Sequence, residues 1–151
     1  MAISAEAVKA LRDKTGVSMM ECKKALEEAG GDEAKALALL SARAAATVGK
    51  KAGRTLAAGT VASYVHTTAQ VGALVLLSCE TDFVSKNEEF TLLARDIAMH
   101  VSAMRPADVT ELLSQQFIKD PSKTITDLIS AATQKFGERI EISDFSCLTV
   151  K

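Results

Sequence analysis

The sequence predicts an α+β protein, in which a group of N-terminal helices precedes a three-stranded antiparallel sheet covered by helices. In the first fifty residues, apolar side chains recur at steps of three and four, which is helical spacing. From about residue 59 the period changes to two, which is typical of a strand, and both periods occur again later. A sheet with helices on one face gives a layered α+β domain.

The first of the predicted elements are short helices within residues 4–48. Ser4 stands where it can cap the first helix. Ser18 and Glu21 have the spacing of a capping box for the second helix. These polar residues directly precede apolar positions at helical intervals, so they indicate where each helix begins.

A third helix is predicted after the glycine pair at 30–31, with Asp32 as its cap. It continues through an alanine-rich stretch of high helix propensity. We expect a helical bundle over residues 1–48. The glycines and lysines that follow predict a linker over residues 49–55.

Residues 56–151 are predicted to form the α+β core domain. Residues 59–66 alternate between two faces, and after a polar turn residues 71–79 follow as a second, more apolar strand, so the two predict an antiparallel hairpin. From Phe90, apolar residues follow helical spacing until Pro106 stops the helix. We expect this apolar stripe to cover the hairpin.

The last part of the core domain contains weaker signals. Residues 107–117 allow a short helix, and residues 117–123 are predicted to be a loop. A helix capped by Thr124 follows, and Gly137 ends it. Residues 139–150 alternate and are expected to add the third strand.

Composition excludes several classes of function. Apolar residues make up 48% and charged residues 25%, which is the balance of a soluble globular protein. A net charge of -1 lacks the basic surplus of nucleic-acid binders, so we expect no direct contact with nucleic acid. No apolar run approaches the roughly 20 residues that cross a bilayer, and the N-terminus does not resemble a signal or transit peptide. We therefore predict a cytoplasmic protein without a membrane partner.

The search for an active site finds none. The glycine patterns that bind phosphate do not occur, and the scattered cysteines and histidines predict no metal site. Cys79 and His66 lie on the predicted hairpin and are the strongest enzyme candidate, as a nucleophile and its base. A buried cysteine at a strand end is more often a small core residue. We predict a protein that is not an enzyme and needs no cofactor.

Two features point instead to a protein partner. The first is the segment Thr81, Asp82, Phe83 and Val84, which we call the 81–84 turn and which connects a strand to a helix. Phe83 is predicted either to contact a partner or to pack on the start of the helix. The second is the pair Met19 and Met20, which suits either an adaptable protein contact or core filling.

Several segments resemble the family of translation elongation factor Ts, the guanine-nucleotide exchange factor of elongation factor Tu. They are VKALRDKTG at 8–16, MMECKKAL at 19–26, CETDFV at 79–84 with NEEF at 87–90, and the later segments 117–124 and 137–140. The resemblance implies an N-terminal bundle similar to ubiquitin-associated domains and a core that contacts the partner's nucleotide domain. It implies no chemical step.

The resemblance also implies the contact residues. Asp82 and Phe83 correspond to the family's core contacts, and the phenylalanine inserts beside the partner's magnesium and phosphate site. The bundle positions that match the family's contact face are Arg12, Met19, Met20 and Lys23. The implied partner is elongation factor Tu, both GDP-bound and nucleotide-free.

The chain departs from the family in being short. Members often carry a duplicated core or a long helical insertion after the first core helix, whereas only a short segment separates Met104 from Phe117 here. We therefore expect a homodimer, or a two-to-two assembly with the partner. A disulfide between copies through Cys147 is the less favoured form of this dimer. The alternative function is a binding module whose bundle holds a nascent-chain, ribosomal or ubiquitin-like partner.

Overall fold

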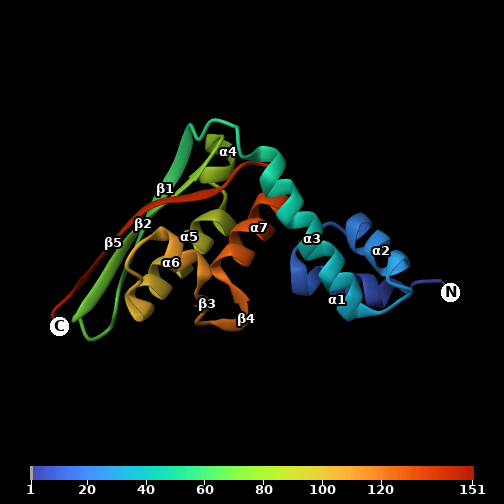
Figure 1. Cartoon of the computed structure of the whole chain (residues 1–151), viewed down its shortest axis with the longest axis horizontal. Coiled ribbons are helices and arrows are strands. Elements are labelled where there is room, and N and C mark those ends of the chain that lie inside the picture. The colour runs from blue at the N-terminus through green and yellow to red at the C-terminus, as the bar shows by residue number, and fades with distance from the viewer. Residues whose placement is uncertain (1) are drawn as a thin grey trace. The chain divides into compact units, whose positions relative to one another are not determined.

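The structure is a computed structural model that describes residues 2–151, and the chain divides into two compact units (Figure 1). The first unit extends to Gly53 and includes Ser130–Gly137. The second unit contains Arg54–Ile129 and Glu138–Lys151. The 81–84 turn belongs to the second unit.

The first unit contains the helices α1 (Ala5–Thr15), α2 (Met19–Glu28) and α3 (Glu33–Lys51). The predicted caps are confirmed, because the side chains of Ser4, Ser18 and Asp32 each accept a backbone N–H from the first turn of their helix. Apolar side chains from all three helices form the core of the bundle: Val8, Leu11, Val17, Cys22, Ala25, Leu26, Ala36 and Leu40.

The prediction that a linker begins at residue 49 is wrong for its first three residues. α3 continues to Lys51, and Gly49 lies within it. A glycine inside a helix costs only about 1 kcal/mol relative to alanine, which the preceding alanine-rich turns tolerate. Lys50 and Lys51 occupy the last turn, where positive charge interacts favourably with the helix dipole.

The second unit contains the predicted three-stranded antiparallel sheet, with the order β1-β2-β5. The strands are β1 (Ala58–Val65), β2 (Val71–Cys79) and β5 (Glu141–Thr149). The β1–β2 hairpin is confirmed, with Ala58 opposite Cys79 at one end and Val65 opposite Gly72 at the other. The sheet therefore has one central strand and two edges.

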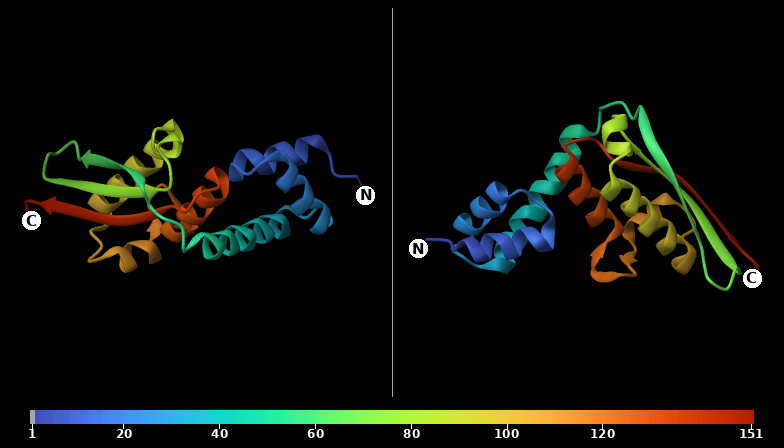
Figure 2. Two further views of the ribbon diagram at one scale, coloured as in Figure 1. Left: turned by 90° about the horizontal axis from the view of Figure 1, so that it is seen from above. Right: turned by 180° about the vertical axis from the view of Figure 1, so that it is seen from behind.

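Helices cover one face of this sheet, as predicted (Figure 2). α5 (Glu88–Met104) packs against β1 and β2 with its apolar stripe buried, and α6 (Val109–Ser114) follows it. α7 (Ile125–Phe136) starts at the predicted Thr124 cap and ends at Gly137, and it is divided between the units, since its residues from Ser130 onward belong to the first. The fold is therefore α+β.

The predicted loop at residues 117–123 is instead part of a small hairpin. β3 (Gln116–Phe117) pairs antiparallel with β4 (Asp120–Thr124). Phe117 is buried, which ties this segment to the core. Pro121 is tolerated because a two-stranded pair has free edges where no backbone N–H is needed.

Candidate partner-binding site

The 81–84 turn begins where β2 leaves the sheet and continues into a single turn of helix, α4 (Asp82–Ser85). The sequence predicted a turn between a strand and a helix here, and the structure shows that this turn is itself helical. Ser85 N donates to Thr81 O at 3.2 Å, and Lys86 N donates to Asp82 O at 3.0 Å. Asn87 then caps α5, so only a short segment lies between the two helices.

The turn divides its two apolar side chains between solvent and core. Phe83 is 92% exposed, whereas Val84 is 9% exposed. The alternative in which Phe83 packs on the helix start is therefore wrong. Burying a phenylalanine side chain contributes about 1.5–3 kcal/mol, so an exposed one is favourable to cover with a partner.

The surroundings of Phe83 are polar and carry both signs of charge. Asp82, Lys86 and Asn87 line a shallow hollow of about 390 Å³ together with Phe83. An aromatic side chain with a polar rim is the arrangement found at the centre of protein–protein contacts. Val84 is the buried anchor of the turn, while Thr81, Asp82 and Phe83 face outward.

The residues predicted on the bundle are exposed as well. Met19 is 42% and Met20 68% exposed, so neither fills the core. Cys22, Ala25 and Leu26 form the inward face of α2, which leaves Met20 and Lys23 on its outward side. Met19 lies in the first turn, beside the inward face, and is still partly exposed. Arg12 is exposed on α1. The bundle residues and the 81–84 turn lie in different compact units.

The structure separates the pair that was the strongest enzyme candidate. Cys79 lies opposite Ala58, while His66 follows Val65 at the other end of the hairpin. At about 3.3 Å per residue, this places them roughly 25 Å apart. Burial, with a smaller effect of the Glu138 charge, raises the pKa of the Cys79 thiol above its usual value. A buried neutral thiol without a base is not a nucleophile.

Within residues 2–151, no group of three or more His, Cys, Asp or Glu side chains is placed to hold a metal ion. None of the helices in that range has the length and apolar character needed to cross a membrane.

Comparison with known proteins identifies the family. The family model described as elongation factor TS matches residues 40–110 and 80–151 of this chain. The chain belongs to the elongation factor Ts family. The elongation factor Ts of Thermosipho melanesiensis is 40% identical over 98% of this chain and 98% of its own length. That of Leptospira biflexa is 39% identical over 97% of this chain and 96% of its own.

The relatives of the elongation factor Ts family are longer than this chain. The alignment with the Leptospira biflexa protein extends over 191 residues, whereas the chain has 151. The same holds for the protein of Thermodesulfovibrio yellowstonii, which is 40% identical over 189 residues. These relatives therefore contain residues without a counterpart here, in agreement with the short form expected from the sequence.

One part of the site was missed by sequence reasoning. Glu138 accepts the backbone N–H groups of Glu80 and Thr81 at the entry of the turn, although it lies far away in the chain. Glu80 in return accepts the backbone N–H of Arg139. No local pattern in the sequence indicates such a contact, because two glutamates on connecting segments are ordinarily solvated surface residues.

Proposed function

We propose that this chain is a cytoplasmic guanine-nucleotide exchange factor for elongation factor Tu. The observation that carries the proposal is Phe83, an almost fully exposed aromatic side chain on the 81–84 turn of an elongation factor Ts family member. The turn inserts beside the partner's magnesium and phosphate site and promotes GDP release. No covalent step and no cofactor are required.

The physical basis is linkage. A protein that binds nucleotide-free elongation factor Tu more tightly than the GDP-bound form must weaken GDP binding by the same factor. To accelerate release about a thousandfold, the turn must favour the opened partner by roughly 4 kcal/mol. One well-buried aromatic contact supplies a free energy of this size. Phe83, together with Asp82, is the group available for it.

The bundle residues supply a second contact with the same partner. Arg12, Met19, Met20 and Lys23 present flexible apolar and cationic side chains, which suit an adaptable protein surface. The alternative of a module that acts through the bundle alone is not favoured, because the family model matches residues 40–151, which lie mostly outside the bundle.

The test is the release of fluorescently labelled GDP from elongation factor Tu. We expect Phe83→Ala to lower the maximal release rate at least tenfold, since truncating a central aromatic contact costs 2 kcal/mol or more. Leu92→Ala is the matched control, because Leu92 is an exposed apolar residue on α5 outside the turn. A wild-type chain that leaves GDP release unchanged would exclude the proposed function.

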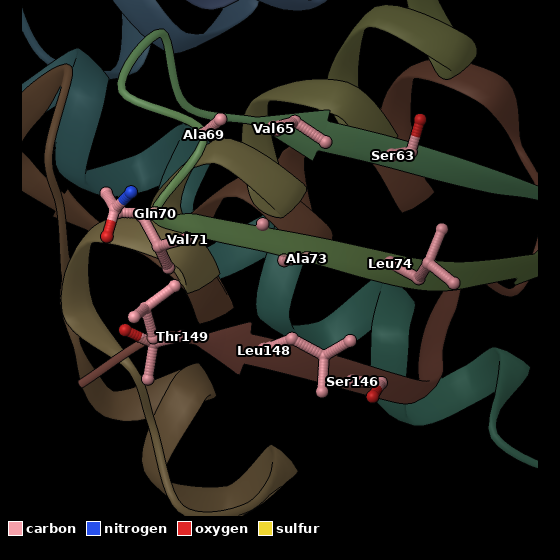
Figure 3. Close-up of a pocket in the computed structure, with 12 residues that line it drawn as sticks. Ser63, Val65, Ala69, Gln70, Val71, Ala73, Leu74, Ser146, Leu148 and Thr149 are labelled. Carbon is pink, nitrogen blue, oxygen red and sulfur yellow. The ribbon is translucent and has the colours of Figure 1, made fainter.

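We also propose that two copies associate through the uncovered face of the sheet. Val65, Leu74 and Leu148 are exposed on three neighbouring strands and line one hollow of about 430 Å³ (Figure 3). Removing these apolar side chains from water is favourable, and a twofold dimer covers the same face of both copies. Leu74→Glu is expected to yield a monomer in sedimentation analysis, whereas a wild-type monomer would contradict the dimer.

A further inference from the structure

The backbone that enters the 81–84 turn is bound by one carboxylate from a distant part of the chain. Glu80 N and Thr81 N each donate to Glu138 Oε1 at 3.0 Å. The Thr81 hydroxyl donates to Glu138 Oε2 at 2.6 Å. Hydrogen bonds to an ionised acceptor are stronger than those between neutral groups. Glu138 therefore fixes two successive residues at the base of the turn.

The Thr81 hydroxyl does not cap the helix that it precedes. Thr81 is the N-cap residue of α4, but its side chain makes no capping hydrogen bond. A threonine at this position normally accepts an N–H from the first helical turn. A single helical turn has little stability of its own. Since α4 lacks its own side-chain cap, its start is held by the contact with Glu138.

The contact is reciprocal. Arg139 N donates to Glu80 Oε2 at 2.5 Å, so each glutamate accepts a backbone N–H from the other's segment. Glu80 also forms an ion pair with Arg54, with 3.5 Å between Oε1 and Nη1. The Glu80 side chain is only 18% exposed, so its carboxylate is largely removed from water. The end of β2 and the segment before β5 are thereby joined at the base of the turn.

We propose that Glu138 is a positioning residue that holds the 81–84 turn in the conformation that displays Phe83. It acts through Glu80 and Thr81 and needs no contact with the partner. This inference rests on the proposed exchange function. Without Glu138 the turn samples other conformations, and the apparent affinity for the partner falls by the fraction that remains competent. The maximal rate of release is unchanged, because Phe83 itself is intact once bound.

The test compares GDP release across a range of concentrations of this protein. We expect Glu138→Ala to raise the half-saturating concentration about fivefold to twentyfold, the inverse of a competent fraction of about one fifth to one twentieth. The maximal rate is expected to be retained. Glu138→Gln should recover most of the loss, because its amide oxygen still accepts from both backbone N–H groups. Phe83→Ala differs by lowering the maximal rate.

A matched control is available in the same segment. Glu141 has the same charge and forms an ion pair with the Arg139 guanidinium at 2.6 Å, and it makes no hydrogen bond to the turn. Glu141→Ala should leave the half-saturating concentration unchanged. Glu138→Ala with an unaltered half-saturating concentration would overturn the proposal, as would Ala and Gln variants that lower the maximal rate equally.

Amide hydrogen exchange tests the contact without the partner. In Glu138→Ala, the Glu80 and Thr81 amides are expected to lose protection, while the Val75 and Leu77 amides in β2 keep theirs. This result would also show that the variant is folded. Equal protection of Glu80 and Thr81 in both proteins would overturn the positioning role. Failure of the exchange function itself would instead appear as unchanged GDP release with the wild-type chain.

Discussion

The helical bundle and the 81–84 turn both expose apolar side chains, but the contacts that hold those side chains in place differ in range along the sequence. In the bundle, α2 has its own cap and packs on a core made by three consecutive helices. In the turn, α4 lacks a side-chain cap and depends on a carboxylate 57 residues away from Thr81. An exposed methionine on a stable helix needs only local structure. An exposed phenylalanine on a single helical turn needs tertiary support.

The largest expected effect is a loss of stability on truncating a side chain in the bundle core. This substitution tests whether the bundle, which holds the α2 surface, is stable independently of the second unit. Leu11 is fully buried, and Leu11→Ala should lower the free energy of unfolding of the first unit by about 2–5 kcal/mol. Urea unfolding followed by bundle amide signals measures this. Met20→Ala is the exposed control, with a change expected within about 0.5 kcal/mol.

Tyr64 fluorescence distinguishes unfolding of the second unit from unfolding of the bundle in this experiment. It is the chain's one tyrosine, there is no tryptophan, and it lies on β1 in the second unit. Its fluorescence therefore reports on the sheet alone. If Leu11→Ala lowers the free energy of unfolding reported by Tyr64 as much as that reported by the bundle signals, the two units unfold together. That result would contradict the view that the bundle surface needs only local structure.

A smaller effect is expected from the caps. Asp32 accepts the Lys35 N–H at 3.1 Å, so Asp32→Ala should cost about 1 kcal/mol of bundle stability. Thr81→Val removes the hydroxyl that donates to Glu138 and caps nothing. It should therefore raise the half-saturating concentration for GDP release, which Asp32→Ala should leave unchanged. Denaturant titration and the release assay measure the two results. If Thr81→Val leaves the half-saturating concentration unchanged, the hydroxyl does not help to hold the turn.

The smallest expected effect is a loss of stability at acidic pH, which should differ between the two units. His100 is fully buried, and its ring accepts the Ile118 N–H at Nδ1 and contacts Gln115 Oε1 through Nε2 at 2.9 Å. Burial lowers the pKa of His100 below its usual value of 6.5. The unfolded chain then binds a proton that the folded chain excludes. The stability that depends on neutral His100 is therefore fully present above pH 6.5, and it is lost as the pH decreases toward the lowered pKa.

This acid sensitivity belongs to the second unit, because both histidines lie there. Thermal melting followed by Tyr64 fluorescence should show the loss, while bundle signals should not. His100→Gln is expected to flatten the pH dependence at some cost in stability. His66→Gln is the control, since His66 is exposed. A pH dependence that His66→Gln removes and His100→Gln preserves would contradict the assignment to His100.

The elements that could be predicted from the sequence are those with local signals. The caps at Ser4, Ser18 and Asp32 were correct because a cap depends on residues within one turn. The β1–β2 hairpin was correct because alternation and a short polar turn specify antiparallel pairing. The 117–123 hairpin was missed because each of its strands is too short to show a period.

The sequence by itself identified the two surfaces that we propose to bind a partner, since TDFV at 81–84 and the methionine pair at 19–20 are recognisable without any structure. Only the tertiary structure decided how Phe83 and Val84 divide between solvent and core, and which distant residue holds their turn. The physical reason is the separation along the chain of the residues that interact. Caps, periods and motifs depend on neighbours along the chain, whereas the Glu138 contact joins segments that the pairing of β2 with β5 brings together.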